Sequence, residues 1–286
     1  MSPEGANPTV RQRELGMRLR ELRNGLGLTV EDVAERLLCS ATKISRLETG
    51  TRRASLRDVR DLCGIYGVAD QSDADELMDL ARQAREPGWW SKYDEPVLSP
   101  LLGLEQEAIA ITSYSMYYVP ALIQTSDYAR AIIKGIERKI DPAALDQRVE
   151  ARLRRQGLLE QETPPRYRAL LDEAVLRRQV GGPAAMQEQL DKILKSAADE
   201  KATVQVIPFD VGAHASTDSN FDFLEFGENS PQRTVVFVEG LFSNRYQERP
   251  IEIERYREAL EYLRDAALSP RDSTSLITEI RSTHTA

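Results

Sequence analysis

The sequence contains very few residues that could bind a metal or form a disulfide. Cys39 and Cys63 are its only cysteines, they do not form a CxxC pair, and its only histidines are His214 and His284. This supply is too small for a zinc-binding module or a disulfide framework, and it fits a reducing compartment. We therefore expect no metal, no cofactor and a cytoplasmic location.

Long apolar runs are also lacking. No stretch approaches the roughly 18 apolar residues that a membrane-spanning helix needs. The first residues, MSPEGANPTV, do not contain the apolar segment of a signal peptide. Apolar residues make up 41% and charged residues 29% of the chain, as in soluble globular proteins, so we expect no membrane partner.

Acidic residues outnumber basic ones overall, but the excess is unevenly distributed. The formal net charge is −8. Residues 1–60 carry 12 Arg and Lys against 8 Asp and Glu, a net charge of +4, whereas residues 61–286 carry 26 against 38, a net charge of −12. Because DNA affinity requires local cations rather than a basic whole chain, the first segment is the candidate DNA-binding part.

Apolar spacing and capping residues predict five helices in this first segment. Thr29, Ser40 and Ser55 are the expected N-caps of the second, third and fourth helices, and Gly50 is expected to end the third. The expected ranges are 11–25, 30–37, 41–49, 56–63 and 75–84.

A second domain is expected to follow the break at Glu86-Pro87-Gly88. Its pattern predicts helices over 103–118, 126–137, 142–161, 183–198, 251–267 and 270–280, and strands over 167–171, 203–208, 221–226 and 234–238. Helices followed by mixed strands and helices indicate an α+β fold. We thus predict an all-α five-helix domain over 11–85 and an α+β domain over 86–286.

The second and third helices have the pattern of a helix-turn-helix. Ala34 is small enough for two helices to cross closely, while Ile44 and Leu47 supply the inward edge of the third helix. The other edge is polar and could enter the major groove, which is about 12 Å wide. The candidate DNA-binding residues are Thr29, Ser40, Ala41, Thr42, Lys43, Ser45, Arg46, Thr49, Arg52 and Arg53.

The segment LTVEDVAERLLCSATKISRLETG resembles the xenobiotic-response-element (Cro/repressor-like) family of helix-turn-helix regulators. The resemblance implies that Ala41, Thr42 and Arg46 read bases and that Thr49, Arg52 and Arg53 meet phosphates. It also implies a structural ion pair between Arg23 and Glu48. From chemistry alone, Arg46 is the best reader because Arg can pair bidentately with guanine, and Lys43 is the better phosphate contact.

Three positions depart from the family pattern. Val30 replaces a Gln that often holds a phosphate, and Leu38 replaces the usual Gly of the turn. If Leu38 keeps a left-handed conformation, the cost is of order 1 kcal/mol. Ala41 offers only a methyl contact, for example to thymine. These departures bear on the strength and specificity of DNA binding.

The segment after Arg85 carries a second resemblance. The motifs REPGWW, YYVPALIQTSDYARA, VQVIPFDVGAHAS and VVFVEGL resemble the C-terminal domain of actinobacterial regulators described as WhiJ-like or Scr-type antitoxin-like. The resemblance implies a transcription regulator, often paired with a small protein encoded nearby. It supplies no catalytic residues.

Two groups of polar residues in this domain invite a chemical interpretation. Asp210, His214 and Ser216 lie within seven residues, but triad members usually come from separate elements, and no GxSxG motif is present. We expect His214 to organise a loop by hydrogen bonding, with partner or ligand contact as the alternative, and we expect no enzyme activity. Asp172 and Glu173 are expected to cap the next helix rather than to bind a metal.

Tyr114, Tyr117 and Tyr118 form an aromatic and aliphatic cluster with Leu122 and Ile123. Core packing is one interpretation. The other is the wall of a ligand or partner groove, for which Tyr117 and Tyr118 are the candidates.

Two functions remain open at this stage. The first is a repressor-type regulator that binds a double-stranded palindromic operator as a homodimer, with a second domain that receives a protein or small-molecule signal. The second is an antitoxin-like interaction protein that sequesters a small partner and regulates its own operon. A basic partner would favour the second, because the net charge of −12 would attract it.

Overall fold

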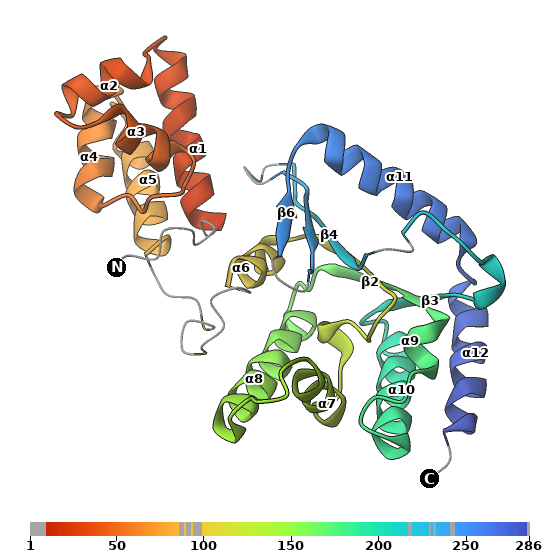
Figure 1. Cartoon of the computed structure of the whole chain (residues 1–286). Helices are drawn as coiled ribbons and strands as arrows, with labels where there is room; N and C mark the ends of the chain where they lie inside the picture. Colours follow the sequence, from red (N-terminus) through yellow and green to blue (C-terminus); the bar gives the residue numbers. More distant parts are fainter. Residues whose placement is uncertain are drawn as a thin grey trace. The chain divides into compact units, whose positions relative to one another are not determined.

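A computed structural model describes residues 10–85, 89, 93, 99–216, 219–228, 230, 233–240 and 244–284 (Figure 1). The chain divides into two compact units, residues 1–107 with 228–232, and residues 108–227 with 233–286. Each unit is described by itself. No helix in the described part of the chain is long and apolar enough to span a membrane.

The first unit begins with the five expected helices. Their bounds are α1 Val10–Gly25, α2 Val30–Arg36, α3 Ala41–Glu48, α4 Leu56–Ile65 and α5 Gln71–Gln83. Helix α5 starts four residues earlier than the pattern predicted, because Asp70 accepts a hydrogen bond from the Ser72 amide at 2.8 Å and caps it. Leu19, Val33, Ile44, Val59 and Ala81 lie at the centre of the core that these helices enclose.

Gly16 sets how closely α1 approaches the end of α3. A Cβ atom at this position would lie 2.6 Å from the carbonyl oxygens of both Leu47 and Glu48, a distance that real Cβ atoms do not show. Gly50, which follows α3, has φ of 70°, and a Cβ atom at this position would lie 3.0 Å from the backbone of Gln12. Glycine is therefore required on both sides of this contact.

The second unit contains a six-stranded mixed sheet. Its strands are β1 Ala110–Ser115, β2 Arg166–Asp172, β3 Thr203–Ile207, β4 Phe221–Glu225, β5 Val235–Val238 and β6 Arg245–Gln247. They lie in the order β3-β2-β1-β4-β5-β6. The β1–β2 and β2–β3 pairs are parallel, whereas β4, β5 and β6 form an antiparallel meander from β1. Ile111 pairs with Tyr167 on one side and with Leu224 on the other.

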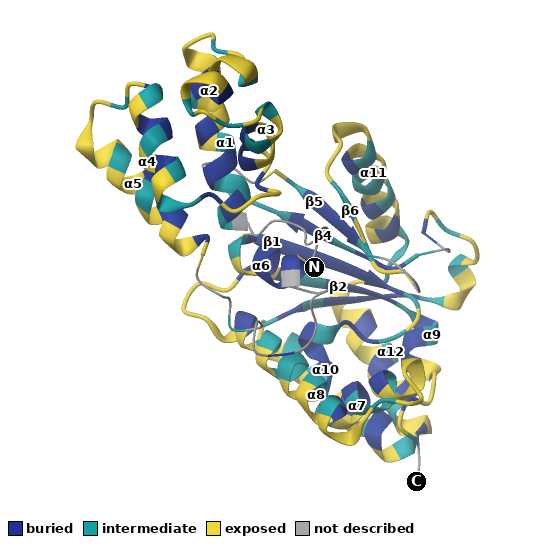
Figure 2. Ribbon diagram, turned by 60° about the vertical axis from the view of Figure 1, so that its left-hand side comes forward, coloured by how far each residue is buried: buried dark blue, intermediate teal, exposed yellow. Residues whose placement is uncertain are grey.

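Helices cover both faces of this sheet. In this unit the bounds of the helices are α7 Ser126–Ile136, α8 Pro142–Arg155, α9 Glu173–Arg177, α10 Pro183–Ala198, α11 Pro250–Ala266 and α12 Pro270–Thr283, with 3-10 turns at Ala121–Ile123, Gln156–Glu160 and Phe209–Val211. Helix α6, Ser99–Glu107, belongs to the first unit. Helix α11 packs on one face through Leu260 and Leu263, and α7, α8, α10 and α12 lie on the other side (Figures 1 and 2). The predicted fold class, a five-helix domain followed by an α+β domain, is confirmed.

One predicted helix is wrong. Residues 103–118 contain the end of α6 and then strand β1, which occupies the middle of the sheet and is buried at all six positions (Figure 2). A strand covered on both faces does not alternate between apolar and polar residues, so its apolar spacing resembled that of a helix. The sequence interpretation also missed the edge strand β6, which is only three residues long.

Candidate nucleic-acid interface

Helix α2 begins with a complete capping box. The Thr29 hydroxyl accepts the Asp32 amide at 3.1 Å, and the Asp32 carboxylate accepts the Thr29 amide at 2.8 Å. Hydrogen bonds from the Thr29 hydroxyl and amide lower the pKa of Asp32 below its ordinary value. The residue three positions after the cap therefore completes the box with Asp in place of the usual Glu.

The turn between α2 and α3 has a strained residue at its tip. Leu38 has φ of 52°, in the left-handed region, and its side chain is 94% exposed. The Leu38 and Cys39 amides donate to the carbonyl oxygens of Glu35 and Ala34, which closes the end of α2. The turn therefore keeps the geometry that the sequence comparison anticipated for glycine, although the residue is Leu.

Helix α3 has one apolar edge and one polar edge. Ser40 caps it by accepting the Lys43 amide at 3.2 Å, and Ile44 and Leu47 are buried in the core of the first unit. Among the predicted DNA-binding residues, those with exposed side chains are Thr29, Ser40, Thr42, Ser45, Arg46, Thr49, Arg52 and Arg53, while Ala41 and Lys43 are half-buried. The predicted positions thus lie on α3, its cap and the loop that follows, except for Thr29, which caps α2.

The three candidate arginines are available for a ligand. Arg46, Arg52 and Arg53 form no ion pair within the described part of the chain. The loop that carries the last two is held to α3, because the Arg52 amide donates to the Arg46 carbonyl at 3.0 Å and the Thr49 hydroxyl donates to the Ser45 carbonyl at 2.9 Å. Unpaired guanidinium groups on a braced loop are suited to phosphate or base-edge contacts.

Lys43 has an internal partner that the sequence interpretation did not anticipate. Its ammonium lies 2.5 Å from the Asp58 carboxylate, and Asp58 also accepts the Ser55 amide at 3.0 Å at the start of α4. Burial opposes ionisation of Asp58, but the hydrogen bonds from Lys43 and Ser55 outweigh burial and lower its pKa. Lys43 therefore ties α3 to α4, and its predicted phosphate contact would have to share this ammonium. The sequence spacing of Ser55 and Asp58, which form a second capping box, was the signal that could have indicated a structural role for Asp58.

Arg23 and Glu48 form a bidentate ion pair at the base of α3. Arg23 Nε donates to Oε1 at 2.6 Å and Nη2 donates to Oε2 at 3.0 Å, and both side chains are at most 10% exposed. Arg23 also donates to the Leu28 carbonyl at 2.6 Å. The hydrogen bond from Arg23 to Glu48 raises the pKa of Arg23. This group joins the end of α1, the start of the helix-turn-helix and the end of α3.

In the second unit, His214 joins a loop to two strands. Its Nε2 lies 3.4 Å from the Tyr114 hydroxyl and 3.6 Å from an Asp172 carboxylate oxygen, while the Ser216 amide approaches Nδ1 at 3.5 Å. The Ser216 hydroxyl donates to the Ser219 carbonyl at 3.1 Å. His214 therefore holds the loop after β3 against the ends of β1 and β2, in the manner of a loop-organising residue.

The three tyrosines of the predicted cluster lie in different environments. Tyr114 is fully buried in the sheet core, whereas Tyr117 is 45% exposed and the Tyr118 hydroxyl donates to Glu239.

Glu173, the second carboxylate of the Asp172-Glu173 pair, forms an ion pair with Arg177 at 2.6 Å and accepts a hydrogen bond from the Phe209 amide at 2.9 Å. No cluster of metal-ligating side chains occurs among the residues that the structure describes.

These features define a protein with an N-terminal helix-turn-helix domain and a larger α+β domain. Residues 14–77 match a family model described as a helix-turn-helix domain, and residues 98–279 match one described as a domain of unknown function (DUF5753). The second match spans more than half of the chain, so the chain belongs to the DUF5753 family. No curated protein and no solved structure matches this chain.

Proposed function

We propose that this protein is a sequence-specific DNA-binding transcription regulator of the xenobiotic-response-element type, with α3 as its recognition helix. The observation that carries the proposal is the two-sided character of α3. Ile44 and Leu47 are buried, whereas Thr42, Ser45 and Arg46 are exposed on a helix that is capped at its start and braced at its end. A helix of this kind can lie in the major groove with its first turns toward base edges.

The exposed residues divide into base readers and phosphate contacts. Arg46 is the proposed specificity residue, because its guanidinium has no competing ion pair in the described residues and can bond two acceptors of guanine. Thr42 and the Ala41 methyl group are proposed to contact neighbouring bases. Arg52 and Arg53 are proposed to meet phosphates, which position the domain without reading sequence.

The proposal also includes the oligomeric state of the regulator and the role of its second domain. A homodimer on a palindromic operator would combine two modest half-site affinities. The domain over residues 86–286 is proposed to receive a protein or small-molecule signal and to have no enzymatic activity. The resemblance to WhiJ-like regulators and the charge asymmetry support this division, because the acidic segment is a poor surface for DNA.

The same charge asymmetry favours a second candidate function. Residues 86–286 carry 24 Arg and Lys against 32 Asp and Glu, and this net charge of −8 would attract a small basic protein, as expected of an antitoxin-like partner-binding domain with DNA binding reserved for autoregulation. Co-purification of a basic partner with the full chain, and its release by salt, would support this candidate.

The first test compares binding of the full chain to its own upstream DNA and to scrambled DNA at about 150 mM salt, a concentration at which non-specific binding is weak. Selective binding that is lost in Arg46→Ala and kept in Arg264→Ala would support the proposal. Arg264 is an exposed arginine on α11, in the other unit, so it controls for loss of one positive charge. Equal affinity of the wild-type chain for both DNAs would contradict sequence-specific binding by this chain alone.

A further inference from the structure

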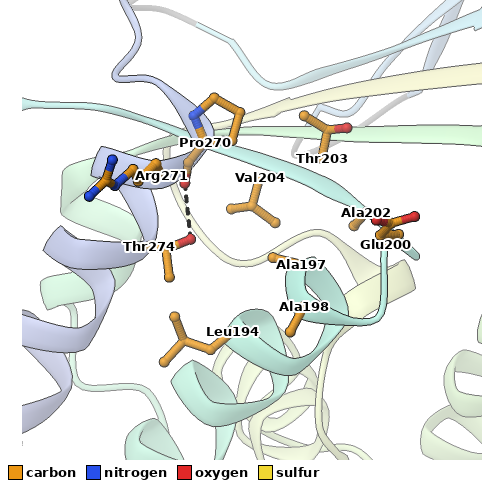
Figure 3. Close-up of a pocket in the computed structure, with 10 residues that line it drawn as sticks. All are labelled: Leu194, Ala197, Ala198, Glu200, Ala202, Thr203, Val204, Pro270, Arg271 and Thr274. Atoms are coloured by element: carbon orange, nitrogen blue, oxygen red, sulfur yellow. Dashed lines mark hydrogen bonds between the residues drawn. The ribbon is translucent and has the colours of Figure 1, made fainter.

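A surface pocket of about 540 Å³ lies beside β3, between α10 and α12 (Figure 3). Much of its lining consists of small or aliphatic side chains, among them Leu194, Ala197, Ala198 and Val204. The Thr274 hydroxyl donates to the Pro270 carbonyl at 2.9 Å within α12, and the Arg271 and Glu200 side chains point away from the pocket (Figure 3). The pocket therefore indicates no particular ligand, and the outer face of α11 is the more informative surface.

Helix α11 packs on the sheet with one face and turns the opposite face away from it (Figures 1 and 2). Its buried side chains are Ile253, Leu260 and Leu263. On the opposite face, Ile251 is 67% exposed and Tyr262 is 50% exposed, although both side chains are large and largely apolar. Arg255 and Glu258 are exposed between them. We call these four residues the outer stripe of α11.

The outer stripe has the spacing of a seam between two packed helices. Its residues follow one another at intervals of four, three and four, which is close to the 3.5-residue repeat of such seams. The stripe is about 16 Å long, at 1.5 Å per residue. It is also symmetrical, because Ile251 and Tyr262 lie equally far from its midpoint, and so do Arg255 and Glu258. Turned end over end, the stripe therefore places apolar opposite apolar and basic opposite acidic.

The two charges of the outer stripe are not used within the chain. Arg255 and Glu258 are three residues apart on one helix face, yet neither forms an ion pair with the other or with any other residue that the structure describes. The neighbouring Glu254, in contrast, pairs with Arg257 at 3.5 Å, so it adds little net charge beside the stripe. Arg255 is thus available to a carboxylate and Glu258 to a guanidinium group.

We propose that the outer stripe of α11 binds a second copy of this chain, with the two α11 helices antiparallel about a two-fold axis through the midpoint of the stripe. Ile251 then lies against the partner's Tyr262, Arg255 meets the partner's Glu258, and each contact occurs twice, as two-fold symmetry requires. A small basic protein would attract Glu258 but repel Arg255, so the charges favour a second copy. The interface supplies the homodimer of the proposed regulator and in that respect rests on that function, but self-association does not require DNA binding.

The test measures self-association of the full chain without DNA by analytical ultracentrifugation, from about 1 to 100 μM, a range that covers the micromolar affinities of small interfaces. We expect the wild type to form dimers in this range. Arg255→Glu places acidic groups opposite each other, and Glu258→Arg places basic groups opposite each other, so each should weaken the dimer at least about tenfold. An equimolar mixture of the two variants sets each acidic stripe against a basic one and should dimerise as the wild type does.

Two further variants locate the interface. Tyr262→Ser removes an apolar contact without a change of charge and should also weaken the dimer, whereas Arg264→Glu, an exposed position of α11 outside the stripe, should dimerise as the wild type does. A wild-type chain that stays monomeric at about 100 μM, single charge variants that dimerise as the wild type does, or a mixture no stronger than its components would each overturn the proposal. DNA binding of the wild type is measured separately, so failure here is distinguishable from failure of the proposed regulator function.

Discussion

The Arg23 guanidinium holds the Glu48 carboxylate through two hydrogen bonds, of 2.6 and 3.0 Å, across 25 residues of sequence. Because both side chains are nearly buried, neither charge can be hydrated well if the other is removed. The pair thereby fixes the end of α3 to α1 independently of DNA.

We predict that Arg23→Met destabilises the first unit by about 3 kcal/mol or more, because it leaves the Glu48 carboxylate buried without its partner. The double variant Arg23→Met/Glu48→Leu should recover much of that loss, since no buried charge remains. Urea denaturation of the three proteins measures the effect. A double variant no more stable than Arg23→Met would show that the uncompensated charge is not the cause.

Gly16→Ala is expected to disturb the same region by a different mechanism. The added methyl group would lie 2.6 Å from two backbone oxygens at the end of α3, and backbone cannot move aside as a flexible side chain can. Overpacking of this kind costs about 1–3 kcal/mol. Gly25→Ala, with open space around its Cβ position, is the matched control and should retain wild-type stability or exceed it. Thermal unfolding that affects both variants equally would contradict the steric explanation.

The sequence was informative where structure depends on near neighbours and less so where it depends on distant ones. The N-caps at Thr29, Ser40 and Ser55 could be predicted from sequence, because each side chain accepts a hydrogen bond from the amide three residues along the chain. The exclusion of a side chain at Gly16 depends on α3, more than 30 residues later. The environment of Tyr114 depends on His214, 100 residues away. Such contacts leave no local pattern in the sequence. The strand at 110–115 was predicted as helix because it is buried on both faces and does not alternate between apolar and polar residues.

Replacement of Leu38 by glycine should stabilise the protein. Leu38 has φ of 52° and its side chain is 94% exposed, so the substitution relieves backbone strain and sacrifices almost no packing. We expect a net gain of about 1 kcal/mol at most, because glycine also increases the entropy of the unfolded chain. Leu38→Ala, which keeps a Cβ atom, should not show the gain. Equal unfolding midpoints for the glycine and alanine variants would contradict a strained turn.

Asp58 should make stability depend on pH in the acid range. Its pKa in the folded chain lies below the ordinary value of 3.8, so its contribution is fully present above that value and is lost as the pH falls through the folded pKa. We expect Asp58→Asn to lose about 1 kcal/mol near pH 7, an amount limited by solvent screening, and to differ less from wild type below pH 3.8. Denaturant midpoints measured between neutral and acid pH give the comparison. A difference that grows as the pH falls would contradict the assigned sign.

Arg46 and Arg52 should respond differently when DNA binding is measured as a function of sequence and salt. Arg46→Ala removes a proposed base contact, so it should lose about 1–3 kcal/mol on the operator and little on scrambled DNA. Arg52→Ala removes a proposed phosphate contact, so it should weaken both DNAs alike and reduce the slope of log K against log salt by about one. An Arg46→Ala variant that loses affinity equally on both DNAs would place Arg46 on the phosphate backbone. Specificity would then have to come from Thr42, Ser45 or the Ala41 methyl group, which are the other candidates on the first turns of α3.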